Sequence, residues 1–188
     1  MKAKWGFKPA GARSPSRPGI DRLNKLAKSL DALARKDETY IRKAREIGAL
    51  RRQAALELHG ICQNFVHALN QLLSEIELEF DPQEYGMESF QDTGLNLFQI
   101  NARGRILQIK FEATPELSST EDFRVPYILA GTVRCFNQQL LERDLIEEQS
   151  LFCTIEKSRH HWRFFDARTY RSGLVDANYL AGLMEQLV

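Results

Sequence analysis

A proline-free stretch, residues 21–79, constrains the fold more than any other part of the chain, because it covers nearly a third of the 188 residues. Its apolar residues recur at steps of three and four, which is the seven-residue repeat of helices that wind around one another. Asp37 and Arg51 stand where the repeat would place two further apolar residues. The stretch therefore predicts a long coiled-coil-like helix or a helical hairpin. The repeat consists of Leu23, Leu26, Leu30, Leu33, Tyr40, Ala44, Ile47, Ala54, Leu58, Ile61, Phe65, Ala68 and Leu72.

The ends of this helix are predicted from local signals. Asp21 is a suitable N-cap, and Pro82 disfavours helical backbone at Asp81. An unbroken helix of roughly 59 residues would span about 90 Å, which exceeds the size of a compact domain made by this chain. We therefore expect it to project towards a partner or to fold back, with a break near 37–39 or at Gly48, since an interior glycine costs about 1 kcal/mol relative to alanine.

The apolar stripe of the helix changes in width along its length. It is narrow and flanked by Lys and Arg in the first half, and it widens from Ala54 onward. A wide stripe suits packing against a sheet, whereas a narrow one suits a two-helix seam. We expect the second half to dock on a globular body and residues 21–52 to bind a partner protein or a second copy, with an intramolecular helix pair as the alternative. The predicted interaction seam is Leu23, Leu26, Leu30, Leu33, Tyr40 and Ile47.

Apolar residues after Pro82 mostly alternate with polar ones, which predicts an antiparallel meander of about four to six strands. We expect strands at 95–100, 107–112, 127–135, 151–156 and 162–165, a hairpin turn at 101–104 and a polar loop at 114–123. Residues 137–149 fit either a short helix or a hairpin, and we favour the hairpin. Asp176 is the expected N-cap of a C-terminal helix. The chain is thus predicted to be α+β, with a basic disordered tail (1–20), the long helix or hairpin (21–80) and an antiparallel α+β domain (81–188).

Charge is distributed unevenly along a chain whose net charge is only +1. Residues 1–52 contain 15 Lys/Arg and 5 Asp/Glu, and the remainder contains 11 and 20. A basic segment with interleaved aromatic residues suits nucleic acid or an acidic protein surface. The alternative is that the basic arm and the acidic body neutralise each other. The candidate binding residues are Lys2, Lys4, Trp5, Lys8, Arg13, Arg17, Arg42, Lys43, Arg45, Arg51 and Arg52.

The sequence also contains signals that bear on the cellular location of the protein. No apolar run approaches 18 residues, so we expect no membrane span, and the basic N-terminus lacks the apolar stretch of a secretory signal. Cys62, Cys135 and Cys153 have no disulfide-framework spacing. These features predict a cytoplasmic protein, and nothing in the sequence indicates a cofactor.

One segment suggests metal chemistry. Asp92-x-Gly94-x-Asn96 is followed after a hairpin by Gln108-x-Lys110. This arrangement resembles the PD-(D/E)xK superfamily of metal-dependent nucleases, and the resemblance implies Mg²⁺ held by Asp92 and Gln108 with Lys110 steadying the attacking water. The resemblance covers about 20 residues, Asn96 replaces a second acid, and further strands follow where a βαβ unit would be needed. The alternative is that Gln108 and Lys110 form the solvated face of a strand.

Three other groups of residues could carry chemistry. His160 and His161 with Cys135 and Cys153 could bind zinc, although adjacent strand residues point to opposite faces. His59 and His67 lie two helical turns apart, and we interpret them as partly buried or surface residues. An aromatic and basic cluster could stack bases, but core packing is favoured. The cluster consists of Trp162, Arg163, Phe164, Phe165, Arg168, Tyr170 and Arg171.

Together these features predict a non-enzymatic intracellular adaptor or assembly subunit that oligomerises or docks through its helical arm. A nucleic-acid-binding protein that uses residues 1–52 is the second hypothesis. A degenerate PD-(D/E)xK-like nuclease is the third.

Overall fold

The computed structural model describes residues 18–120, 123–156 and 159–188. It confirms the α+β prediction of a long N-terminal helix, an antiparallel meander and a C-terminal helix. The sheet has seven strands, slightly more than expected. The elements are α1 (Pro18–Asn70), β1 (Glu79–Asp81), a 3₁₀ turn (Met87–Ser89), β2 (Asn96–Ala102), β3 (Arg105–Ser118), β4 (Tyr127–Phe136), α2 (Gln138–Glu142), β5 (Glu148–Glu156), β6 (Arg159–Asp166), β7 (Arg171–Leu174) and α3 (Ala177–Glu185).

Helix α1 is a single element of 53 residues, so the break expected at 37–39 or 48 was wrong. It begins at Pro18 instead of following an Asp21 cap, which agrees with the tolerance of proline in a first helical turn. It also ends at Asn70, well before Pro82. The Asn70 side chain accepts a hydrogen bond from the Leu78 amide (2.8 Å) and donates one to the Leu78 carbonyl (3.0 Å). This pairing with the backbone leading into β1 accounts for the early end.

The chain divides into two compact units, Met1–Lys43 and Ala44–Val188. The division falls inside α1, between Lys43 and Ala44, so the second part of the helix belongs to the same unit as the sheet.

The seven strands pair in sequence order, each antiparallel to the next. The β2–β3 turn lies at Arg103-Gly104, as predicted, and both residues have positive φ (51° and 84°). Such backbone matches the twist of a tight hairpin and favours glycine. The Gly104 amide also donates to the Asn101 side chain at 2.8 Å.

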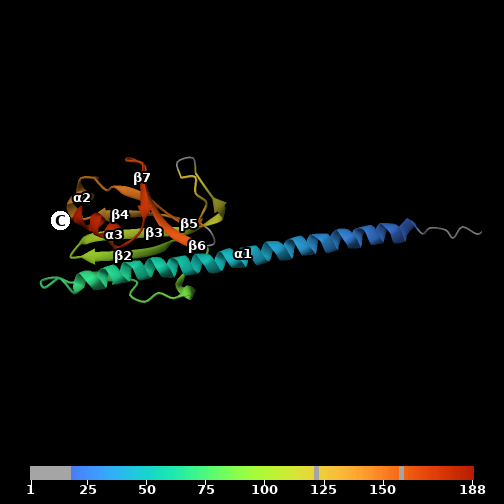
Figure 1. Cartoon of the computed structure of the whole chain (residues 1–188), viewed down its shortest axis with the longest axis horizontal. Helices are drawn as coiled ribbons and strands as arrows, with labels where there is room; N and C mark the ends of the chain where they lie inside the picture. Colours follow the sequence, from blue (N-terminus) through green and yellow to red (C-terminus); the bar gives the residue numbers. More distant parts are fainter. Residues whose placement is uncertain (1–17, 121–122, 157–158) are drawn as a thin grey trace, which may run out of the picture. The chain divides into compact units, whose positions relative to one another are not determined.

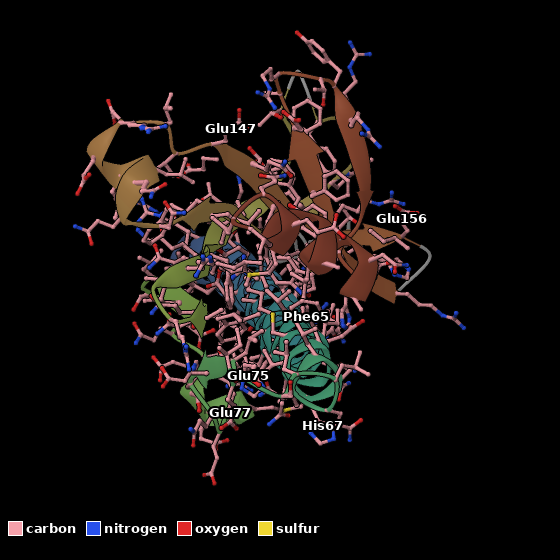
Figure 2. All side chains as sticks on the ribbon, turned by 90° about the vertical axis from the view of Figure 1, so that its left-hand side faces the viewer. Phe65, His67, Glu75, Glu77, Glu147 and Glu156 are labelled. Atoms are coloured by element: carbon pink, nitrogen blue, oxygen red, sulfur yellow. The ribbon has the colours of Figure 1, made fainter. Side chains whose placement is uncertain are left out.

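One face of the sheet forms the main core. Leu107, Ile109 and Phe111 alternate towards this face along β3. Helix α1 contributes fully buried Ala54 and Leu58, as the widening of its stripe predicted. Figure 1 shows the α1 residues from Ala44 onward running along the sheet. In Figure 2, Phe65 is directed into the interior while His67 lies on the outer side of the same helix.

The opposite face of the sheet is largely polar, with one aromatic cluster. Phe123, Tyr127, Phe152 and Phe165 are buried together there. The rings of Phe123 and Phe152 stack with centroids 4.4 Å apart. The loop that carries Phe123 therefore covers part of this face.

Two local expectations in this region were wrong. Strand β3 continues to Ser118, through part of the segment expected to be a polar loop. Residues 138–142 form the short helix α2 in the β4–β5 connection, which is the alternative to the favoured hairpin. The Asn137 side chain accepts from the Leu140 amide and so caps this helix. The expected Asp176 cap of α3 is confirmed, since its carboxylate accepts from the Tyr179 amide at 2.9 Å.

Two glycines provide a matched test of the packing. A Cβ on Gly131 would lie 2.1 Å from the Lys110 carbonyl oxygen and 2.7 Å from Phe111 Cβ, whereas one on Gly60 would meet no atom within 4 Å. We expect Gly131→Ala to lower the free energy of unfolding by about 1–3 kcal/mol through overpacking. Gly60→Ala should raise it by about 0.5–1 kcal/mol, because alanine favours the helix. Urea denaturation followed by circular dichroism measures both changes. Equal effects of the two substitutions would contradict the close approach of β3 to Gly131 of β4.

Candidate functional site

The most conspicuous surface feature is a row of exposed apolar side chains on α1, which we call the leucine stripe: Leu23, Leu26, Leu30, Leu33 and Tyr40. Their exposed fractions range from 54% for Leu26 to 71% for Tyr40. The spacing places all five on one helical face. Monomeric proteins rarely expose an extended apolar surface, so this row, which Asp37 interrupts between Leu33 and Tyr40, is a candidate interaction surface.

Ile47, the sixth predicted seam residue, has a different environment. It is partly buried and packs against the main core. The same seven-residue repeat continues through Ala54, Leu58 and Phe65, which the sheet covers. One repeat along α1 therefore has two environments, exposed at residues 23–40 and buried from Ala54.

The polar residues around the leucine stripe are mostly basic. Residues 22–43 contain seven Lys/Arg and three Asp/Glu, all of them exposed. Between described residues, none of the ion pairs involves this segment. Ser29 and Thr39 donate to the carbonyls of Lys25 and Arg35, four residues earlier on the helix. The surface thus combines an apolar row with positive charge.

The predicted basic residues fall into three groups. Arg42, Lys43 and Arg45 are exposed. Arg51 and Arg52 instead make contacts within the Ala44–Val188 unit. Lys2, Lys4, Trp5, Lys8, Arg13 and Arg17 lie outside the described residues.

Arg51 has a structural role that its position in the repeat did not reveal. Its guanidinium donates to the Ile128 carbonyl (3.1 Å) and to the Thr114 carbonyl. The β3–β4 register shifts after Ala113, so Arg51 binds backbone oxygens where the ladder is irregular. Burial lowers the pKa of Arg51, and nearby Asp92 opposes that shift. An isolated charged residue within an apolar repeat is the signal that could have indicated this contact.

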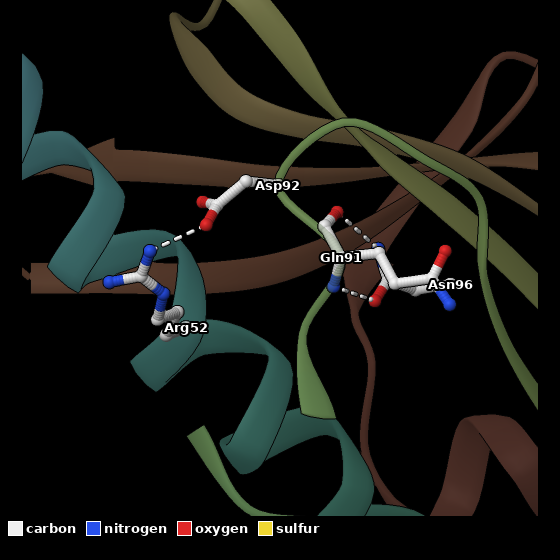
Figure 3. Close-up of polar contacts among 4 residues, drawn as sticks. All are labelled: Arg52, Gln91, Asp92 and Asn96. Carbon is white, nitrogen blue, oxygen red and sulfur yellow. Dashed lines mark hydrogen bonds and ion pairs between the residues drawn. The ribbon is translucent and has the colours of Figure 1, made fainter. Parts of the chain in front are cut away.

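The structure separates the residues of the nuclease-like pattern. Asp92 pairs with Arg52 of α1 at 2.5 Å, while Asn96 is buried and clamps its own loop through the Gln91 backbone (Figure 3). Gln108 lies on the sheet face opposite α1, where it bonds to Gln99 and Arg134.

Lys110 shares that face with Gln108 and is half-buried. Gln108 is itself buried against Gln99 and Arg134, so the alternative of a solvated strand face was wrong for this residue. Asp92 is therefore not brought together with Gln108 and Lys110. Among the described residues, no group of three or more His, Cys, Asp or Glu is arranged to hold a metal ion.

The histidines take part in separate contacts. His160 Nε2 lies 2.5 Å from Glu57 of α1, whereas His161 is its neighbour on a strand and so points to the other face. His59 is buried more deeply than expected. Its Nε2 donates to the Pro82 carbonyl at 2.8 Å, and its ring stacks on Tyr85 with centroids 5.3 Å apart. His67 is exposed, and its ring contacts Gln71.

The three cysteines are buried and unpaired. Burial raises the pKa of Cys62 and of Cys135 to about 12. Burial, followed by the nearby Glu57 charge, also raises the pKa of Cys153. A thiol is a nucleophile or a metal ligand only as its thiolate, so these environments suit structural residues.

The aromatic and basic cluster near residue 165 is mostly packing. Trp162 is buried, and its indole N–H donates to the Ala54 carbonyl of α1 at 2.8 Å. Phe164 stacks on Tyr179 of α3 with centroids 4.2 Å apart. Phe165 belongs to the aromatic cluster on the opposite face.

The arginines of the same cluster pair with acidic side chains. Arg163 pairs with Glu156 at 3.0 Å, and Arg168 pairs with Glu147. Tyr170 and Arg171 are exposed.

None of the helices in the described part of the chain is both long enough and apolar enough to cross a bilayer. No family model, curated protein or solved structure matches the chain. The candidate site is therefore argued from the geometry of this chain alone, and its main feature is the leucine stripe.

Arg51 can be tested by removing its charge while keeping its volume. We expect Arg51→Met to lower the free energy of unfolding by about 1–3 kcal/mol, because two carbonyls lose a charged donor. Arg42→Met is the control, since Arg42 is exposed and its replacement should change stability by no more than about 0.5 kcal/mol. Urea denaturation measures both, and indistinguishable midpoints would contradict a stabilising role for Arg51.

Proposed function

We propose that this protein is a non-enzymatic assembly subunit that self-associates through the leucine stripe. The observation that carries the proposal is the exposure of Leu23, Leu26, Leu30, Leu33 and Tyr40 at coiled-coil spacing. Each leucine is more than half exposed, and fully burying such a side chain is worth about 1.5–3 kcal/mol. Pairing with a second copy would remove all five side chains from water at once.

Asp37 favours an antiparallel pair. It continues the repeat that contains Leu23 and Leu30, so a parallel pair in register would bring two Asp37 carboxylates together in the seam. In an antiparallel pair centred between Leu30 and Leu33, Leu30 faces Leu33 of the second copy and Leu23 faces Tyr40. Each Asp37 then faces Leu26, and the two carboxylates are far apart.

The charge of the segment gives the association a characteristic salt dependence. Residues 22–43 carry more Lys and Arg than Asp and Glu, so two copies of the segment repel each other. Salt screens exposed charges over about 8 Å at physiological ionic strength, and higher salt therefore favours pairing. A cytoplasmic location is part of the proposal, because three unpaired cysteines suit a reducing compartment.

The first test removes the apolar row. We expect the full chain to sediment as a dimer at tens of micromolar and Leu26→Ser/Leu30→Ser to sediment as a monomer. Leu72→Ser is the matched control, because it removes an 82% exposed leucine outside the leucine stripe and should leave the dimer intact. Circular dichroism checks that each variant keeps its fold.

Disulfide cross-linking between cysteine variants tests whether the two helices of the dimer run antiparallel. An antiparallel pair links Leu23→Cys of one copy to Tyr40→Cys of another when the two variants are mixed, and it links neither variant to itself. A wild-type chain that stays monomeric at tens of micromolar in high salt would overturn the proposal.

Nucleic-acid binding is a second candidate, supported by the exposure of Arg42, Lys43 and Arg45. Phosphate contacts make affinity salt-dependent, with a slope of about −0.7 per contact for a single strand. We expect alanine at all three positions to weaken binding of a labelled single strand and to flatten the salt dependence. Deleting residues 1–20 tests the tail separately. Binding that neither change affects would remove this candidate.

A further inference from the structure

An apolar groove lies at the end of α1, within the Ala44–Val188 unit. It has a volume of 470 Å³. Figure 2 looks onto this end of the helix, where Phe65 points inward and Glu75 and Glu77 lie nearby. Small-molecule sites usually have volumes of about 300–1,000 Å³ and mainly apolar walls. The apolar wall consists of Phe65, Leu69, Leu73, Ile76, Leu78, Ala102, Ala181, Met184 and Val188.

A second groove adjoins the first and is polar. Its volume is 720 Å³, and its lining includes Arg103, Arg105 and Arg143 together with one acid, Glu142. Arg105 and Val188 line both grooves, so the apolar space opens beside a cationic one. Glu185, at the apolar groove, is the other acidic side chain of the two linings.

Backbone contacts position two of these arginines without neutralising them. Arg103 donates to the Glu75 carbonyl, and Arg105 Nε donates to the Leu187 carbonyl, both at 3.0 Å. Between described residues, none of the ion pairs involves Arg103, Arg105 or Arg143. Glu142 accepts a hydrogen bond from Gln138. The side chains that line the polar groove therefore include three arginines and one glutamate, beside an apolar wall.

We propose that the two grooves together bind a long-chain carboxylate, with its aliphatic chain in the apolar groove and its carboxylate at Arg105. The apolar walls recognise methylene groups, and the guanidinium recognises the anionic head through charge-assisted hydrogen bonds. Neutral and cationic amphiphiles of the same chain length lack that second interaction. This site is independent of the leucine stripe.

Displacement of a fluorescent fatty acid, measured below the micelle concentration, tests the proposal on the full-length chain. Dodecanoate should displace the probe, dodecanol should do so at least tenfold more weakly, and dodecyltrimethylammonium more weakly still. Affinity should rise about fourfold per added methylene until the groove is filled. Equal displacement by dodecanoate and dodecanol, or no displacement by either, would overturn the proposal.

Two variants locate the site. Arg105→Gln should weaken dodecanoate about tenfold or more and leave dodecanol unchanged. Ala181→Trp should block both ligands by filling the apolar groove. Arg124→Gln is the control, since it removes an exposed arginine outside both grooves. Arg105 is exposed, so Arg105→Gln should keep its fold. The proposal can therefore be tested with this variant even if Ala181→Trp fails to fold.

Two outcomes identify another occupant and overturn the proposal. One is displacement of the probe by a peptide of residues 18–43 when dodecanoate fails to displace it, which would assign the groove to a second copy of the chain. The other is association only with anionic phospholipid vesicles, which would assign the surface to a membrane.

Discussion

The close packing of α1 on the inner face of the sheet underlies the structure of the Ala44–Val188 unit. Ala54, Ala55, Leu58 and Cys62 have no exposed surface, and two of the four are alanines, which let the helix backbone approach the strands. The indole of Trp162 uses that proximity to donate a hydrogen bond to a helical carbonyl. Because an unpaired buried indole N–H would be costly, this bond helps to fix the position of the helix on the sheet.

Polar contacts then define the rotation of α1 on the sheet. Arg51 reaches two strand carbonyls where the β3–β4 ladder is irregular, and His59 contacts the Pro82 carbonyl. An apolar interface alone permits small shifts, whereas directional hydrogen bonds do not. Arg51 therefore replaces an apolar residue in the repeat at a point where the sheet offers acceptors.

Some of this arrangement could be predicted from the sequence, since its signals are local. The helical period, the alternation in β3, the turn at Arg103-Gly104 and the Asp176 cap each depend on neighbouring residues. The end of α1 could not be predicted, because Asn70 pairs with Leu78 across a loop. The missed roles of Arg51 and His59 likewise depend on residues far along the chain. The leucine stripe follows from periodicity, whereas the two grooves combine segments that only folding brings together.

The burial of all three thiols has a consequence for the behaviour of the folded chain in an oxidising environment. Cys62, Cys135 and Cys153 are shielded from solvent, and their raised pKa values keep them protonated at neutral pH. Peroxides and alkylating reagents react with cysteine as its thiolate, so the native fold protects these three thiols from both kinds of reagent. Thiol reactivity therefore reports unfolding, and an oxidant that leaves the fold intact should leave these three cysteines unmodified.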